Sequence, residues 1–146
     1  MSDLTFKINA HSASPAKTIV KARNFEIIVD EPQSLGGTDS AANPVEYVLA
    51  AFAGCLNVMG HLIASEMGIR LNGLKIEISG NLNPAKLFGT SSEERAGYKG
   101  ILVKMMPDTD ADEIILQQWL HNVEQRCPVS DNLQNITPVK VELVRT

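Results

Sequence analysis

The sequence predicts a single-domain α+β fold whose elements follow the order βββ-α-ββ-α-β over residues 1–146. Apolar and polar residues alternate over residues 4–29, which is typical of half-buried strands. A long stretch without charged residues follows a helix-start motif at residues 43–46, and a second helical pattern covers residues 110–126. Strands and helices grouped in this way indicate an α+β architecture. A length of 146 residues corresponds to one domain at about 150 residues per domain.

The N-terminal part predicts three strands. The first covers residues 4–8, the second begins at Thr18, and the third covers residues 25–29. A break at residues 22–24 suits a tight hairpin between the second and third strands. The loop at residues 31–40 contains proline and a glycine pair, so it cannot continue a strand.

A central helix is expected to begin at Asn43. This residue is a good N-cap, Pro44 suits the first helical position, and Glu46 can reach back to complete a capping box. The helix should run to about Met67, with Gly68 as the residue that ends it.

Two further strands are expected at residues 74–79 and 101–107. A polar connection at residues 83–97 separates them. Connections longer than about 12 residues are often lids or binding loops, and Phe88 is the one aromatic residue of this segment and its expected apolar anchor.

A second long helix, capped by Asp110, is expected to end near Cys127, because a residue before proline is pushed out of the helical region. Pro128 can open a short new helix through Leu133 and leave Cys127 as its N-cap. Residues 139–143 then read as a closing strand.

The charge pattern predicts no nucleic-acid partner. The chain has 13 basic and 17 acidic residues, for a net charge of −4, and its basic residues are spread along the sequence. Such a chain is expected to lack a basic patch for phosphates. The aromatic content of 5% also argues against a platform for base stacking.

Residues 47–65 carry no formal charge and approach the ~20 residues that cross a bilayer. The segment contains polar residues and many alanines, and its flanks lack an aromatic belt and clustered lysines. It is interpreted as the buried central helix of a soluble fold, so no membrane partner is expected. The first residues have neither the basic region nor the apolar region that a signal peptide contains. A cytoplasmic location is therefore expected.

The chain has two cysteines, Cys55 and Cys127, which in a reducing compartment are either buried hydrophobes or a redox pair. Taken alone, Cys55 reads as a small core residue. Cys127 is expected at a helix N-terminus, where free N–H groups and the helix dipole favour a thiolate. Neither His61 nor His121 shares a helix face with a cysteine, so no zinc site is expected. No dinucleotide motif is present either, and no cofactor is expected.

Three motifs together resemble the OsmC/Ohr family of osmotically induced and organic-hydroperoxide-resistance proteins. They are Leu35-Gly36-Gly37-Thr38-Asp39, the run from Asn43-Pro44 to Gly54-Cys55, and Cys127-Pro128-Val129-Ser130-Asp131. The resemblance runs in order from about Phe25 to the C-terminus. It implies an intertwined homodimer with packed central helices and two thiol sites at the interface.

The resemblance also implies peroxidase chemistry in which Cys55 attacks an organic hydroperoxide and Cys127 resolves the product to a disulfide. A dithiol reductant would then restore both thiols. The expected substrate pocket is apolar, as suits an organic peroxide. Its expected lining residues are Phe52, Leu56 and Met59, with Phe88 closing over them.

Two departures from the family pattern concern the activation of Cys55. Val45 stands where hydroperoxide-reducing members have a glutamate, and the acid lies one step later, at Glu46. Those members also supply an arginine from the first strands, for which Lys17 and Arg23 are the candidates here. A thiol in apolar surroundings needs a nearby cation to ionise, so activation is expected to be weaker in this chain.

Two other functions remain open at this stage. One is a non-catalytic OsmC-like dimer that binds a small hydrophobic ligand, with its thiols as a sensor or as packing. The other is a structural dimer without a ligand. The rate and stoichiometry of thiol loss with an organic peroxide distinguish them from the enzyme.

Overall fold

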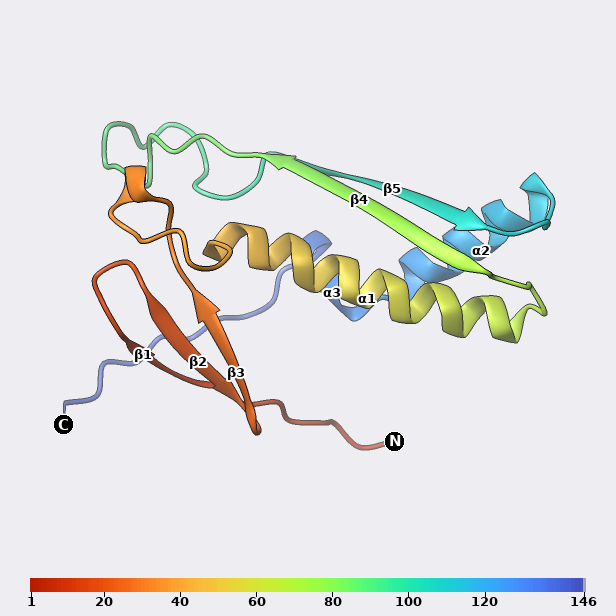
Figure 1. Cartoon of the computed structure of the whole chain (residues 1–146), viewed down its shortest axis with the longest axis horizontal. Coiled ribbons are helices and arrows are strands. Elements are labelled where there is room, and N and C mark those ends of the chain that lie inside the picture. Colours follow the sequence, from red (N-terminus) through yellow and green to blue (C-terminus); the bar gives the residue numbers. More distant parts are fainter. Residues whose placement is uncertain (146) are drawn as a thin grey trace. The chain divides into compact units, whose positions relative to one another are not determined.

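The computed structural model describes residues 1–145 and confirms the α+β class. The chain divides into two compact units, residues 1–50 and the part from residue 51 onward, which are described in turn. Figure 1 shows the elements in chain order, with three strands and a helix followed by two strands and two helices. The single-domain assignment of residues 1–146 stays a prediction.

The first unit contains a three-stranded antiparallel sheet in the order β1-β2-β3. Its strands are β1 (Asn9–Ser12), β2 (Thr18–Ala22) and β3 (Phe25–Val29). The expected tight hairpin joins β2 to β3, and Arg23 adopts the left-handed conformation there with φ 57°. A short 3-10 helix, η1 (Gln33–Leu35), lies in the loop after β3.

The first strand begins later than the sequence pattern indicates. Residues 4–8 were expected to form it, but the paired segment starts at Asn9, opposite Lys21. Residues before Asn9 extend past the end of β2 and have no neighbouring strand to receive their hydrogen bonds. Phe6 and Ile8 are therefore exposed despite their apolar alternation.

Asp30 is completely buried at the end of β3 and organises the loop that follows it. Its carboxylate accepts hydrogen bonds from the backbone N–H groups of Glu31, Thr38 and Ser40 and from the hydroxyls of Thr38 and Ser40, at 2.6 to 3.4 Å. Lys17 Nζ lies 3.7 Å away. The hydrogen bond from the Thr38 hydroxyl is the largest cause that holds the pKa of Asp30 well below its usual range, while burial opposes it.

The same loop requires a glycine at position 37. A Cβ atom there would lie 1.8 Å from the carbonyl oxygen of Glu31, which no side chain can tolerate. Gly37 also donates its N–H to the carbonyl of Pro32. The Leu35–Asp39 motif is thus a close backbone turn around one buried carboxylate.

The central helix α1 (Pro44–Glu66) begins with the expected capping box. The Asn43 N–H donates to the Glu46 carboxylate, and the Glu46 N–H donates to the Asn43 side chain, both at 2.9 Å. The hydroxyl of Tyr47 donates to the carbonyl of Ile28 at 2.6 Å and fastens the first turn to β3. Gly68, in the left-handed conformation, ends the helix as predicted.

The second unit contains the rest of α1, a long antiparallel ribbon of β4 (Gly73–Asn81) and β5 (Gly100–Asp108), and the helices α2 (Glu113–Arg126) and α3 (Pro128–Gln134). The stop of α2 before Cys127 and the new helix from Pro128 are confirmed. The cap of α2 is corrected: Asp112, not Asp110, accepts the hydrogen bond from the N–H of Ile115. Asp112 directly precedes the first helical residue, whereas Asp110 lies outside the reach of an N-cap.

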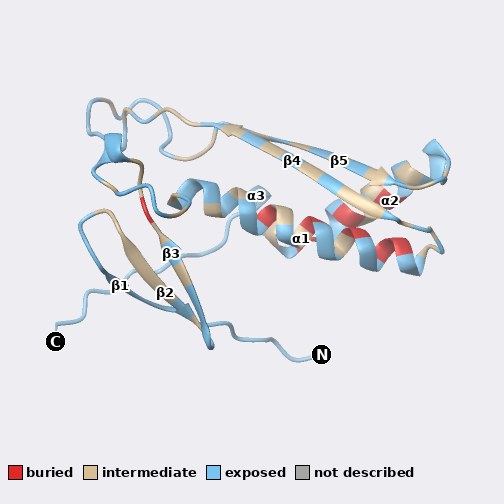
Figure 2. Cartoon of the chain, viewed as in Figure 1, coloured by how far each residue is buried: buried red, intermediate tan, exposed pale blue. Residues whose placement is uncertain are grey.

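The core of the second unit lies where α1, α2 and the β4–β5 ribbon meet, and Figure 2 shows its buried positions along α1 and α2. Gly60 allows the closest approach. A Cβ there would lie 2.9 Å from Leu74 and 3.2 Å from Trp119, and the Trp119 indole donates to the Gly60 carbonyl at 2.8 Å. The buried core side chains are Phe52, Leu56, Ile63, Ala64, Trp119, Val123 and Cys127.

Among the described residues, α1 is the one helix that is long and apolar enough to cross a membrane by length and composition. The core helix of a soluble protein meets the same criteria. In the single chain about 33% of the apolar window of α1 is buried, along the stripe that packs against Trp119, so the interpretation as a buried central helix stays a prediction.

The closing strand expected at residues 139–143 is absent from the single chain. Val139, Val141 and Leu143 are more than four-fifths exposed, and the segment after α3 forms no ladder. A strand exists only where a neighbour accepts its backbone hydrogen bonds, and no described strand of this chain does so.

Replacing Asp30 with asparagine should lower the melting temperature at pH 7 by several degrees, because a neutral amide cannot satisfy five donors and a lysine. Since the pKa of Asp30 is depressed on folding, its stabilisation is present above the unfolded value near 4 and is lost as the pH falls. The difference in melting temperature between wild type and Asp30→Asn should therefore shrink between about pH 5 and pH 2. A difference that stays constant over this range contradicts the assignment. Asp39→Asn, in the same loop, is the matched control.

Replacing Gly60 with alanine should destabilise the fold by about 1–3 kcal/mol, because the added methyl group overpacks the contact with Leu74 and Trp119. Urea unfolding followed by fluorescence measures this change. Ser65→Ala, at an exposed position of the same helix, should change stability by a few tenths of a kcal/mol at most. Equal stability of the two variants would show that α1 does not pack as described.

Candidate redox site

The packing of α1 places Cys55 at the edge of its buried stripe. Phe52, Leu56 and Met59 lie at helical spacing around it and contact or belong to the core. Cys55 itself is partly exposed. The sequence predicts a small core residue at this position, and the structure meets this prediction only in part, because Cys55 packs against the core without being fully buried.

Cys127 occupies the junction between α2 and α3. Its backbone N–H donates to Val123 in α2, and its carbonyl accepts from Asp131 in α3. As predicted, it is the N-cap of α3: Pro128 follows it, and its Sγ accepts a hydrogen bond from the N–H of Ser130 at 3.4 Å. Cys127 is only 1% exposed.

The two thiols meet within the second unit. Cys127 Sγ lies 2.8 Å from Cys55 Sγ and donates a hydrogen bond to it, and both cysteines are free. A disulfide requires an S–S distance of about 2.05 Å, so a small movement joins the two sulfurs. The pair is therefore arranged for reversible disulfide formation.

The protonation of Cys127 follows from its surroundings. Burial is the main cause that raises the pKa of its thiol, and the hydrogen bond to Cys55 acts in the same direction. The N–H groups of Ser130 and Val129 oppose this shift without reversing it. The sequence suggested that the helix N-terminus favours a thiolate at Cys127, but here desolvation of the buried thiol outweighs the two backbone N–H groups, and the pKa is raised.

Two contacts between helices hold the thiols in place. The Trp119 indole bonds the Gly60 carbonyl, and Arg126 bridges both carboxylate oxygens of Glu66 at 2.5 and 3.0 Å. The first of these contacts is buried and the second is exposed. Sequence reasoning placed Trp119 on a helix face but missed both contacts. The signal that could have indicated the first is a glycine in the middle of a long helix.

The three residues expected to tune Cys55 have defined partners in the first unit. Lys17 lies beside the carboxylate of Asp30, the Arg23 guanidinium stacks 4.9 Å above the Phe25 ring, and Glu46 completes the capping box. The capping role of Glu46, favoured by the sequence, is confirmed. The activating roles of these residues stay predictions.

The residues expected to line a substrate pocket have different environments. Phe52 and Leu56 are buried in the core, Met59 packs against it, and Phe88 is 58% exposed in the connection between β4 and β5. The connection at residues 83–97, expected to act as a lid, forms turns and bends. Within the segment between β4 and β5, Lys99 forms an ion pair with Glu94. The pocket assignment stays a prediction.

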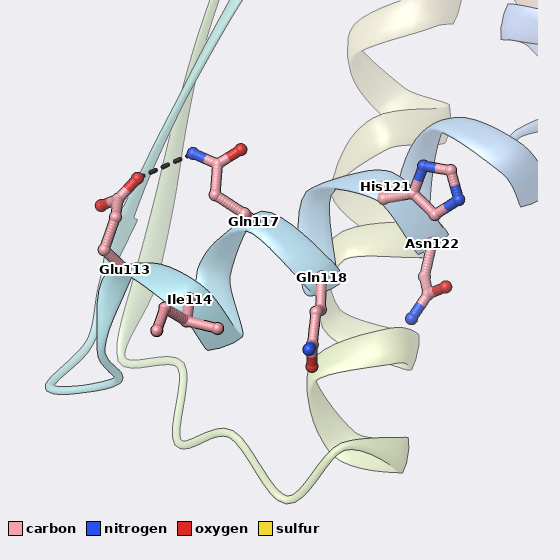
Figure 3. Close-up of a pocket in the computed structure, with 6 residues that line it drawn as sticks. All are labelled: Glu113, Ile114, Gln117, Gln118, His121 and Asn122. Carbon is pink, nitrogen blue, oxygen red and sulfur yellow. Dashed lines mark hydrogen bonds between the residues drawn. The ribbon is translucent and has the colours of Figure 1, made fainter.

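A groove of about 660 Å³ lies on the outer surface of α2 and contains neither cysteine (Figure 3). Two adjacent rows of side chains line it, and Gln117 donates a hydrogen bond to Glu113 at 2.7 Å. The lining residues are Glu113, Ile114, Gln117, Gln118, His121 and Asn122. His121 is thus a surface residue of this groove.

A second groove, of about 520 Å³, lies on β1 and β2 and brings Lys7, Lys21 and Arg23 together with His11. Alternate residues of paired strands share one face, and the register sets Asn9 opposite Lys21. The expectation that the chain has no nucleic-acid partner is not tested by this groove and stays a prediction. Three cations suffice for a small basic groove, although the chain as a whole is acidic.

The histidines and carboxylates do not gather around the thiols. Over residues 1–145, no three His, Cys, Asp or Glu side chains form a group that could hold a metal ion. His61 uses its ring nitrogen for the carbonyl of Asn57, one turn earlier in α1, at 3.0 Å.

Solved structures resemble this fold over nearly its whole length. An OsmC-like protein from Mycoplasma pneumoniae matches with a TM-score of 0.80 and 20% identity, over 92% of this chain and 91% of the other. An organic hydroperoxide resistance protein from Legionella pneumophila, described also as a predicted redox protein, matches with a TM-score of 0.65 and 19% identity over 92% of both chains. The organic hydroperoxide resistance protein OhrB of Bacillus subtilis matches with a TM-score of 0.59 and 18% identity, over 90% of this chain and 91% of the other.

At these identities the structures establish the fold, and the family is established by sequence. No curated protein matches this sequence. The family model of OsmC-like proteins matches residues 37–142, which include both cysteines and the helix-start motif. The chain belongs to the OsmC-like protein family.

Proposed function

We propose that this protein is a thiol-dependent peroxidase that reduces organic hydroperoxides with Cys55 and Cys127. The single observation that carries the proposal is the 2.8 Å contact between the two free sulfurs, one partly exposed and one buried. Two cysteines that serve only as packing have no need to meet sulfur to sulfur. Relatives described as organic hydroperoxide resistance proteins support the same class of reaction.

Exposure assigns the roles of the two thiols. Cys55 is the attacking thiol, because within the single chain it is the partly exposed cysteine of the pair, while Cys127 is 1% exposed. The Cys55 thiolate attacks one peroxide oxygen and the O–O bond breaks. Cys55 becomes a sulfenic acid, and the departing alkoxide takes a proton to give the alcohol.

Cys127 then completes the turnover. Its thiol attacks the sulfenic sulfur from its place in contact with it, the S–S bond forms, and the hydroxyl leaves as water. The raised pKa of Cys127 keeps this thiol protonated until the sulfenic acid appears. An external dithiol reductant restores both thiols, which accords with the predicted cytoplasmic location.

A cation near Cys55 would assist its ionisation. Lys17 and Arg23 remain the candidates, and Val45 replaces the family glutamate that would help to hold such a cation. Activation should therefore be weaker than in family members with the complete arrangement. A non-catalytic dimer that binds a hydrophobic ligand is the alternative that the experiments below would favour if peroxide consumption fails.

A homodimer accompanies this function. The exposed face of α1 carries Gly54, Val58 and Leu62, and the last two are 62% and 45% exposed. The extended segment after α3 exposes a further series of apolar side chains. A second copy of the chain that covers these surfaces would remove a large apolar area from water.

Substituting either cysteine should separate the two steps. Cys55→Ser should lower the rate of cumene hydroperoxide consumption at least about 100-fold, because the attacking sulfur is gone. Cys127→Ser should react once and then stop, with a sulfenic acid on Cys55 that dimedone labels. Stopped-flow kinetics and mass spectrometry measure both outcomes. Consumption by Cys55→Ser at the wild-type rate would refute the proposed roles and favour the ligand-binding alternative.

Replacing Gly54 with leucine should dissociate the dimer, because nothing within the chain lies within 4 Å of a Cβ there and only a partner helix would meet the new side chain. Sedimentation velocity should report a dimer for wild type and a smaller species for the variant. Gln117→Leu, on the outer surface of α2, is the control and should stay dimeric. A folded wild-type monomer of 15.9 kDa would contradict the homodimer.

A further inference from the structure

The proposed reaction leaves Cys55 and Cys127 joined by a disulfide, which a thiol from outside must open. We propose that this reductant attacks the sulfur of Cys55, so that the mixed disulfide forms on α1 and Cys127 is the leaving group. The inference rests on the proposed function and adds the site at which the reductant engages the protein.

The geometry of thiol–disulfide exchange makes access decisive. The attacking thiolate, the sulfur under attack and the departing sulfur lie in one line, and the rate depends on which sulfur can be reached. A nucleophile that attacks Cys55 approaches from the side opposite Cys127. A nucleophile that attacks Cys127 must approach from the side opposite Cys55.

The two approaches differ because Cys127 lies inside the hydrophobic core, whereas Cys55 lies at the border of that core. Cys127 is 1% exposed and belongs to the same buried cluster as Trp119 and Val123. Its backbone is bonded to α2 through the Val123 carbonyl and to α3 through the N–H of Asp131, so it cannot turn outward without breaking helix ends. Within the single chain Cys55 is partly exposed and packs against this cluster without belonging to it, whereas the burial of Cys127 lies inside the chain's own core and does not depend on a partner.

The surroundings of Cys127 also suit a leaving group. The broken S–S bond leaves its electron pair on the Cys127 sulfur as a thiolate, and the N–H of Ser130, 3.4 Å away at the first turn of α3, donates a hydrogen bond to it. The thiolate then takes a proton, because burial raises the pKa of Cys127 above its usual value. This proton capture opposes attack of Cys127 back on the mixed disulfide.

The complete step balances. The external thiolate forms a bond to the Cys55 sulfur, the bond between Cys55 and Cys127 breaks, and Cys127 ends as a thiol. A second external thiol then attacks the reductant's sulfur in the mixed disulfide and releases the Cys55 thiolate. Two external thiols are oxidised to one disulfide, and the protein disulfide is reduced to two thiols.

The test uses the full-length wild-type protein, oxidised with diamide to the Cys55–Cys127 disulfide. The uncharged monothiol 2-mercaptoethanol is added briefly, the exchange is stopped with acid, and peptic peptides are mapped by mass spectrometry. We expect the mercaptoethanol adduct on the Cys55 peptide at least about tenfold more often than on the Cys127 peptide. An adduct mainly on Cys127, or equally on both cysteines, would overturn the inference while leaving the peroxidase intact.

Repeating the exchange in urea supplies the control. The adducts should then divide nearly evenly, because access no longer differs when the core is open. A preference for Cys55 that persists in the unfolded chain would overturn the argument from burial. If neither diamide nor cumene hydroperoxide joins the two cysteines, the proposed function itself fails, and that result is distinct from both of the others.

Discussion

The contact between the sulfurs of Cys55 and Cys127 is the feature on which the account depends, and packing of α2 on α1 maintains it. The two residues come from different helices, so neither local sequence nor local geometry brings them together. Gly60 lets Trp119 approach the backbone of α1, and the buried indole hydrogen bond fixes that approach. A shift of either helix would separate two sulfurs that now lie 2.8 Å apart.

The same packing gives the two thiols different properties although both are cysteines on helices. Cys127 is buried in the core at the junction of α2 and α3, where its neighbours exclude water. Cys55 lies on the border of that core and is only partly buried in the single chain. Burial raises the pKa of Cys127 and outweighs the helix N-terminus beneath it. The burial of Cys127 and the raised pKa of its thiol therefore favour the same two roles. Cys55 reacts with external molecules, and Cys127 reacts only with Cys55.

Much of the local structure could be predicted from the sequence because it depends on neighbouring residues. The capping box of Asn43 and Glu46, the end of α1 at Gly68 and the N-cap position of Cys127 each involve residues within one turn. The sequence motifs also indicated the family to which the chain belongs. In these places the residues that form the sequence pattern are also the residues that make the stabilising contacts.

Features that depend on distant residues were missed or mistaken. The hydrogen bonds to Asp30 come from an irregular loop whose path a Pro- and Gly-rich composition does not define. The pKa of Cys127 depends on how deeply its thiol is buried, and a helix-start motif does not predict burial. Residues 139–143 have a strand pattern without a strand in the single chain, since hydrogen bonding needs a neighbour as well as alternation.

The most direct test of the central claim is the state of the two cysteines after one equivalent of cumene hydroperoxide. Both free thiols should disappear together, and peptide mapping should find Cys55 joined to Cys127 within one chain. Loss of a single thiol, a disulfide between two chains, or two thiols that remain free after the peroxide is added would contradict it.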